Sequence, residues 1–249
     1  MSRITLLALL YKIAFPYTID KFMAGKFIVI EGTDGSGKGE QTIRLVKRIK
    51  DSGKTVAPFD FPRYAEPSAW FVSQFLNGNF GTIDEVGPKT ASLFYALDRY
   101  AAAPAVRVAL AENDVVISNR YVASSLGHQG SKYDDMNERK EYFEWNNDLE
   151  YSINGIPKPD LNIILHIPAE IAQALVDKKM ERQYLSGKKR DLHEADIHHL
   201  KRAEETYKQL AALYPNDFTV VECVENGQLL PIDAVHEKVW AIAARTLGC

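Results

Sequence analysis

The stretch Gly32-Thr33-Asp34-Gly35-Ser36-Gly37-Lys38 stands between a short apolar run and a segment with helical periodicity. Its G-x-x-x-x-G-K spacing is the phosphate-binding P-loop pattern, and a strand before it with a helix after it is the setting that the pattern requires. The glycines let successive backbone N–H groups converge on a phosphate, the helix N-terminus adds partial positive charge, and Lys38 adds a full charge. The sequence therefore predicts a nucleotide-phosphate site here.

Strand-like and helix-like segments alternate outward from this turn. Apolar, β-rich runs predict five strands, at residues 26–31, 55–60, 115–118, 161–167 and 218–223. Helical patterns cover residues 38–51, 67–76, 88–113, 134–151, 169–179, 193–213 and 232–246. Strands that are apolar throughout are typical of a parallel sheet buried on both faces. We expect an α/β fold, a three-layer P-loop sandwich with a five-stranded parallel sheet and helices on both faces.

Three local details of this fold are also predicted. Ile43, Val46 and Ile49 recur every three residues and predict the buried face of the first helix. Pro104 predicts a kink or break in the long helix at residues 88–113. Residues 119–133 are expected to form a polar loop.

Composition limits the class of protein. The 249 residues, 46% of them hydrophobic, suit one domain with a substantial core. A net charge of −3 excludes a basic nucleic-acid coat, so any anion site must be local. The two cysteines, Cys223 and Cys249, exclude a disulfide scaffold and favour a cytoplasmic protein. No apolar run is long enough to span a bilayer, so no membrane partner is expected.

The first residues form a separate segment. Residues 4–15 are apolar apart from Thr5 and Lys12 and faintly resemble a signal peptide, but no small-x-small cleavage site follows. We expect residues 1–24 to be an extension, with Met23 as an alternative start, and residues 25–249 to be a single P-loop domain.

The P-loop departs from its usual pattern at one position. Gly39 stands where a Ser or Thr normally binds Mg²⁺, and Glu40 follows. The ATP-binding prediction covers Gly32, Thr33, Asp34, Gly35, Ser36, Gly37, Lys38, Gly39 and Glu40. The simplest role for Glu40 is a first-turn carboxylate that favours the helix dipole. The alternative is that Glu40 replaces part of the missing metal anchor.

Four further motifs follow the P-loop in order. They are Phe-Pro-Arg-Tyr at 61–64, Leu-Phe-Tyr-Ala-Leu-Asp-Arg-Tyr at 93–100, Asn-Arg-Tyr-Val-Ala-Ser-Ser-Leu-Gly-His-Gln-Gly at 119–130, and Pro-Lys-Pro-Asp-Leu at 157–161. With these motifs the chain resembles the thymidylate kinase family from about Lys26 to the C-terminus. The resemblance implies transfer of a phosphoryl group from ATP to dTMP, with Mg²⁺ as cofactor, in a homodimer.

A monophosphate acceptor needs cations, an aromatic face and polar groups for the base edge. Forked guanidiniums suit phosphate, although each arginine could instead form a surface ion pair, as the neighbours Asp98 and Arg99 suggest. By resemblance Tyr95 or its neighbour Phe94 stacks on thymine, unless it is a core aromatic. Asp34 would accept from the sugar 3′-hydroxyl, and Ser124 and Gln129 would read the base edge. The predicted acceptor residues are Asp34, Phe61, Arg63, Tyr95, Arg99, Arg120, Ser124, His128 and Gln129.

A basic segment is expected to form a lid at about residues 178–191. Between residues 178 and 190 there are six basic side chains and one acidic, a balance of 6 − 1 = +5. The alternative is a solvated turn. The family places a catalytic arginine in the P-loop or in the lid; because Gly35 follows Asp34, the resemblance implies the lid. The predicted catalytic residues are Lys38, Asp34, Arg120, Arg182 and Arg190.

Two alternatives to thymidylate phosphorylation remain open. One is another nucleoside monophosphate kinase or a deoxynucleoside kinase. The other is a nucleotide-binding protein with lost or weak turnover, because the family's Asp-Arg-Tyr is here Asn119-Arg120-Tyr121 and Gly39 also lacks a metal ligand. Glu40 and Asn119, acting directly or through water, are the predicted metal-side residues.

Overall fold

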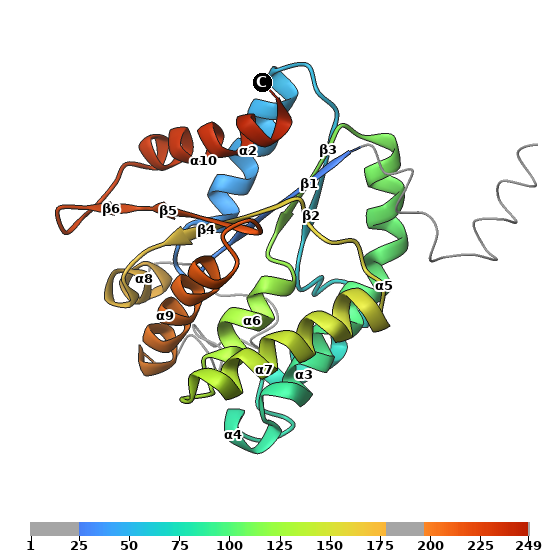
Figure 1. Ribbon diagram of the computed structural model, residues 1–249, viewed down its shortest axis with the longest axis vertical. Coiled ribbons are helices and arrows are strands. Elements are labelled where there is room, and N and C mark those ends of the chain that lie inside the picture. Colours follow the sequence, from blue (N-terminus) through green and yellow to red (C-terminus); the bar gives the residue numbers. More distant parts are fainter. Residues whose placement is uncertain (1–24, 178–196, 249) are drawn as a thin grey trace, which may run out of the picture.

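The computed structural model describes residues 25–177 and 197–248. Strands from both ranges form one central sheet (Figure 1). Its five strands are all parallel and lie in the order β2-β3-β1-β4-β5. The predicted five-stranded parallel sheet is confirmed. The strands are β1 (Lys26–Glu31), β2 (Val56–Asp60), β3 (Val115–Asn119), β4 (Leu161–His166) and β5 (Phe218–Glu222).

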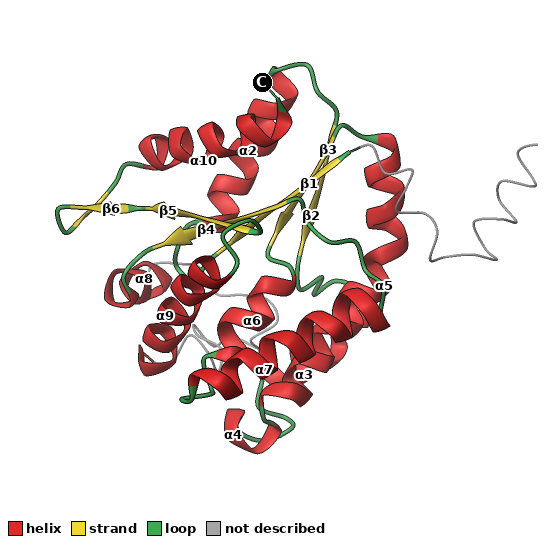
Figure 2. Cartoon of the chain, in the orientation of Figure 1, coloured by secondary structure: helices red, strands yellow, loops and turns green. Residues whose placement is uncertain are grey.

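Helices cover both faces of the sheet (Figure 2). Alternate residues of β1 point to opposite faces: Ile28 and Ile30 pack with α2 and α10, whereas Phe27 and Val29 pack with α5. The three-layer sandwich is therefore confirmed. The helices are α2 (Lys38–Asp51), α3 (Trp70–Leu76), α4 (Ile83–Val86), α5 (Pro88–Glu112), α6 (Val122–Gly130), α7 (Met136–Asn147), α8 (Ala169–Asp177), α9 (Ile197–Leu213) and α10 (Ile232–Leu247).

Three short elements complete the described chain. A 3₁₀ turn, η2 (Pro67–Ala69), precedes α3, and a π-helical turn, η3 (Asp148–Ile153), continues α7. An antiparallel hairpin, β6 (Val224–Glu225) and β7 (Gln228–Leu229), joins β5 to α10. No described helix is long and apolar enough to cross a membrane.

Two details of the predicted helices are wrong. Ile43 is 69% exposed, and the fully buried residues of α2 include Leu45 and Ile49, because a 3.6-residue turn places i and i+4 on one face. Pro104 does not break α5, which runs unbroken from Pro88 to Glu112. Pro104 lies on the exposed side of this helix, where the carbonyl oxygen that loses its partner can bond to water.

The polar loop predicted at residues 119–133 is largely the helix α6, which is a further correction. Gly127 and Gly130 lower its helix propensity by about 1 kcal/mol each, so the local sequence favours a loop. Close packing explains both glycines. A Cβ on Gly127 would lie 2.5 Å from the Tyr207 ring of α9, and one on Gly130 would lie 2.5 Å from the Phe143 ring of α7. Tertiary contacts therefore stabilise α6 against its local preference.

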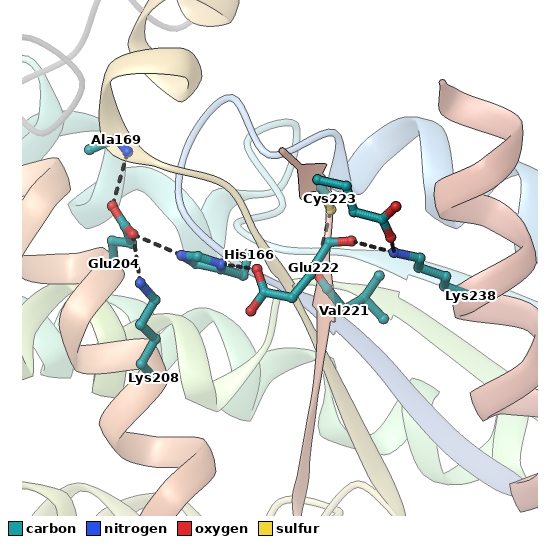
Figure 3. Close-up of polar contacts among 9 residues, drawn as sticks. His166, Ala169, Glu204, Lys208, Val221, Glu222, Cys223 and Lys238 are labelled. Atoms are coloured by element: carbon teal, nitrogen blue, oxygen red, sulfur yellow. Dashed lines mark hydrogen bonds and ion pairs between the residues drawn. The ribbon is translucent and has the colours of Figure 1, made fainter. Parts of the chain in front are cut away.

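A polar cluster fixes the start of α8 (Figure 3). The His166 ring joins Glu222 of β5 through Nδ1, at 2.5 Å, and Glu204 of α9 through Nε2, at 2.8 Å. The other oxygen of Glu204 accepts the backbone N–H of Ala169 at 2.9 Å. Helix α8 is thus anchored to α9 beside the P-loop.

Candidate active site

One cavity of about 430 Å³ opens where β1, β2 and β3 end. The strand register places Ile30, Asn119 and Asp60 side by side at this carboxyl edge, where ligands of parallel α/β sheets collect. Most of the predicted site residues line the cavity: Asp34, Gly35, Gly37, Lys38, Gly39, Glu40, Phe61, Tyr95, Arg99, Asn119, Arg120, Ser124, His128 and Gln129. Gly32, Thr33, Ser36 and Arg63 do not line it, and Arg182 and Arg190 lie outside the described residues.

The P-loop closes the phosphate end of the cavity. Gly37, with φ of 87°, is the N-cap of α2, a left-handed conformation that favours glycine. Lys38 is buried, and its Nζ donates to the Thr33 carbonyl oxygen at 2.7 Å. A Cβ on Gly35 would lie 2.2 Å from the Ala172 carbonyl oxygen of α8. No side chain fits at this position, so this P-loop cannot carry an arginine there.

Arg120 faces the P-loop from a strained backbone. Its φ is 64°, a left-handed conformation that costs a non-glycine residue about 1–3 kcal/mol. The backbone is held in place because its N–H donates to Ile30 O at 3.0 Å and its carbonyl oxygen accepts from Ser118 Oγ at 2.6 Å. The guanidinium forms an ion pair with Asp34. Burial lowers the pKa of Arg120, but Asp34 and the other acidic groups around it together hold the pKa above its ordinary value, so the group keeps its charge.

Glu31 supports this arrangement and was missed by the sequence reasoning. Its fully buried carboxylate accepts the backbone N–H groups of Tyr121 at 2.7 Å and Ser124 at 3.2 Å. It also accepts the hydroxyls of Ser124 at 2.7 Å and Tyr207 at 3.3 Å. Glu31 thereby ties β1 to the start of α6 and to α9. The available signal was an acidic residue that closes an otherwise apolar strand directly before the P-loop.

The two arginines Arg63 and Arg99 are paired with carboxylates. Asp98 pairs with Arg63, at 3.0 Å, and not with its neighbour Arg99. Arg99 pairs with Glu150 of η3 at 2.5 Å, and both side chains are almost fully buried. Burial lowers the pKa of Arg99, but the charge and the hydrogen bonds of Glu150 oppose this, and the pKa lies above its ordinary value. Both arginines are therefore ion-paired, but in the interior and not at the surface as the alternative supposed, and Arg99 also lines the cavity.

The aromatic residues divide into two groups. Tyr95 lines the cavity, whereas Phe94 packs in an apolar cluster with Phe71 and Phe80 at centroid distances of 5.7 and 5.3 Å. Of the two candidates, Tyr95 is the one in position to face a ligand. Phe61 is buried in the wall and makes an edge contact with Tyr121 at 5.5 Å.

Polar residues of α6 lie at the far end of the cavity. Gln129 Oε1 accepts from Lys132 Nζ at 2.5 Å. His128 Nδ1 contacts His199 Nε2 at 3.3 Å, and burial lowers the pKa of His128 well below its usual value, so the ring is neutral at pH 7. The Ser124 hydroxyl donates to Glu31 and accepts from Arg120 at 3.4 Å. Gln129 is thus better placed than Ser124 to read a base.

Three polar side chains near the P-loop could bear on a metal: Glu40 and Asn119, which were predicted, and Asp60, which the sequence reasoning missed. Glu40, half exposed, accepts from Arg44 at 2.5 Å. The amide Nδ2 of Asn119 donates to Asp60 Oδ1 at 2.8 Å. Partial burial raises the pKa of Asp60, while Asn119, Arg120 and Lys38 oppose that rise. The described residues contain no group of three or more His, Cys, Asp or Glu side chains that could hold a metal by themselves.

Fold and cavity together define a P-loop nucleotide-binding protein with a second binding region beyond the phosphate site. The family model "Thymidylate kinase" matches residues 30–239. The chain is 32% identical to the thymidylate kinase of Mycobacterium tuberculosis (strain CDC 1551 / Oshkosh) over 186 residues, which is 74% of this chain and 85% of the relative. It is 29% identical to that of Clavibacter michiganensis subsp. michiganensis over 225 residues, 89% and 98% of the two chains. The chain belongs to the thymidylate kinase family.

A solved structure bears out the fold independently. The thymidylate kinase of Candida albicans superimposes with a TM-score of 0.67 and covers 90% of this chain and 92% of its own, at 20% identity. At that identity the likeness shows the P-loop α/β fold. The predicted resemblance and the fold class are both confirmed.

Proposed function

We propose that this protein transfers the γ-phosphoryl group of ATP to dTMP, giving dTDP and ADP. The observation that carries the proposal is one continuous cavity, which extends from the P-loop to Tyr95 and Gln129. Phosphoryl transfer needs no covalent intermediate, so the protein contributes positioning and electrostatic stabilisation. Lys38 and the P-loop N–H groups would hold the ATP phosphates, and Arg120 would stabilise charge on the transferring group. The Asp34 carboxylate, held by Arg120, would accept from the sugar hydroxyl.

The thymine end of the site is built from α5 and α6. Tyr95 offers a stacking face. Because a lysine can only donate, the atom of Gln129 that faces Lys132 must be the carbonyl oxygen, which leaves the Gln129 N–H groups to donate to a base carbonyl. Four of the five N–H groups of Arg99 donate to Glu150, Tyr121 and Ser125. Its charge is therefore matched within the protein, and we assign Arg99 to the base side rather than to the phosphate.

A panel of nucleoside monophosphates tests the function directly. With ATP and Mg²⁺ in a coupled ADP-release assay, dTMP should have the highest kcat/KM. Faster phosphorylation of CMP, AMP or GMP would assign the protein to another monophosphate kinase specificity. Binding of ATP without turnover of any acceptor would favour the nucleotide-binding alternative. Comparing dUMP with UMP measures how well the pocket, with His128 beside the sugar, rejects a 2′-hydroxyl.

Lys132 should make dTMP affinity depend on pH. Burial lowers the pKa of Lys132 to about 8, so its charge is present below that pH and is lost as the pH rises through it. The neutral amine holds the Gln129 carbonyl less firmly, and KM for dTMP should rise about threefold or more between pH 7 and pH 9. In Lys132→Met the KM should be raised at pH 7 and nearly flat with pH. A parent KM that does not change over this range would contradict the assigned role of Lys132.

A catalytic arginine is also proposed. Arg182 and Arg190, in the predicted basic lid, are the candidates, and both lie outside the described residues. The support comes from Gly35, where contact with Ala172 leaves no space for an arginine side chain in the P-loop.

Domain limits of 25–249, with residues 1–24 as an extension, stay predictions.

Mg²⁺ is proposed as the cofactor. The side-chain amide oxygen Oδ1 of Asn119 is buried and has no hydrogen-bond partner in the described part of the chain, so a cation or a bound water could be held there, beside the P-loop. Of the two residues predicted from the sequence, Asn119 has this buried unpaired oxygen, whereas Glu40 is paired with Arg44. Mg²⁺ often keeps several waters and is held largely by substrate phosphates. When bound it neutralises charge on the β- and γ-phosphates of ATP.

A homodimer is proposed as the assembly. Leu93, Leu97 and Tyr100, spaced on one face of α5, are each 42–55% exposed. On α3, Trp70 and Phe71 are similarly exposed, and Phe71 stacks on Phe94 of α5. Exposed apolar side chains gathered on adjacent helices favour association with a second copy. A cytoplasmic location is also proposed, because a chain with only two cysteines fits a reducing compartment.

A further inference from the structure

The carboxylate missing from one strand end is present on the neighbouring strand. Asn119 is the last residue of β3, where the family motif has Asp, and Asp60 is the last residue of β2. The two residues are paired in register in adjacent parallel strands. Neighbouring strands lie about 4.8 Å apart, so the exchange moves a negative charge by one strand spacing within the same cavity.

The hydrogen bond between these residues orients both of them. Asn119 Nδ2 donates to Asp60 Oδ1 at 2.8 Å, which turns the amide oxygen of Asn119 away from the carboxylate. That amide oxygen is buried and has no partner among the described residues. An unsatisfied buried acceptor destabilises the structure, so the site gains when a water or a cation approaches it. A carboxylate and an amide oxygen are ligands that Mg²⁺ and its water shell accept.

The surrounding charges distinguish Asp60 from Glu40. Both carboxylates line the cavity, but Asp60 lies in the field of Lys38 and Arg120, two cations at the phosphate end. Glu40 is paired with Arg44, which also bonds to Asp233 at 2.5 Å. The negative charge of Glu40 is therefore compensated on the surface of α2, whereas that of Asp60 faces the phosphate end of the cavity.

We propose that Asp60 and Asn119 together form the protein side of the Mg²⁺ site, with the carboxylate supplied by β2 in place of β3. The inference rests on the proposed ATP-dependent function. Asp60 holds waters of the ion, the orphaned Asn119 oxygen accepts from one of them, and the ATP phosphates provide the direct ligands. The departure at Asn119 is then an exchange of positions and not the loss of a metal-side charge.

Exchanging the two residues tests this inference through metal-dependent binding. The readout is the factor by which Mg²⁺ strengthens binding of the non-hydrolysable analogue AMP-PNP, measured by calorimetry with and without Mg²⁺. Asp60→Asn keeps the size and the hydrogen bond but removes the charge, and should reduce this factor about tenfold. The double variant Asp60→Asn/Asn119→Asp restores one carboxylate at the strand edge and should recover the factor to within about threefold of the parent. Asp51→Asn, at the far end of α2, is the matched charge control.

Each outcome decides the point. The inference would be overturned if Asp60→Asn left the Mg²⁺ factor unchanged. It would also be overturned if Glu40→Gln reduced the factor and Asp60→Asn did not, because the metal would then be held by another group. A double variant as impaired as Asp60→Asn would overturn the exchange. If Asp60→Asn does not fold, Asn119→Asp alone decides, because a second carboxylate should raise the factor at least threefold. A parent that couples Mg²⁺ through Asp60 yet does not phosphorylate dTMP would contradict the proposed function and leave this metal site standing.

Discussion

Arg120→Met should lower kcat for dTMP phosphorylation by at least about a hundredfold, with a smaller change in KM for ATP. The guanidinium faces the P-loop, is paired with Asp34 and keeps its charge despite burial. Methionine keeps much of the side-chain volume but cannot stabilise charge in the transition state. Steady-state kinetics with Arg245→Met, a distant arginine on α10, as control would measure the effect.

The backbone of Arg120 provides a second, independent readout. Arg120→Gly would relieve a left-handed conformation worth about 1 kcal/mol, which offsets part of the lost ion pair. The glycine variant should therefore be at least as resistant to urea as Arg120→Met and equally inactive. A glycine variant that unfolds much more readily than the methionine variant would show that the side chain serves mainly the fold.

Glu31→Leu should lower the free energy of unfolding by about 3 kcal/mol or more. The substitution leaves the buried N–H groups of Tyr121 and Ser124 without their acceptor, and it removes the partner of two hydroxyls. Urea denaturation measures the loss. Glu31→Gln is the control, because its carbonyl oxygen can accept both N–H groups and its amide can donate to the hydroxyls, so it should cost about 1 kcal/mol. A leucine variant as stable as the glutamine variant would contradict the bracing role of Glu31.

The fold was largely predictable because its strong signals are local. The strand at Lys26–Glu31 and the helix at Lys38–Asp51 have the bounds that the pattern predicts, since an apolar run, a glycine-rich turn and a periodic segment each act within a few residues. Helix α6 was not predictable in this way. Gly127 and Gly130 read as loop residues, and the rings that require them, Tyr207 and Phe143, belong to segments distant in the sequence.

The sequence predicts which residues belong to the site better than it predicts which of them contact one another. The P-loop, Tyr95 and the residues after β3 carry motif signals and do line one cavity. The sequence does not show which carboxylate pairs with which arginine. Asp98 is adjacent to Arg99 in the sequence, yet it bonds to Arg63, which follows β2. Asp60 escaped notice for the same reason: its meaning depends on its register with Asn119, which only the sheet defines.

The close approach of Gly35 to Ala172 also bears on how this active site could have evolved. An arginine gained in the P-loop by point mutation would collide with α8, whose first turn Glu204 holds in place. A lineage could reach that arrangement only if α8 also shifted, so two changes would be needed. We therefore expect the position of the proposed catalytic arginine to follow lineage, rather than to change back and forth among close relatives of this chain.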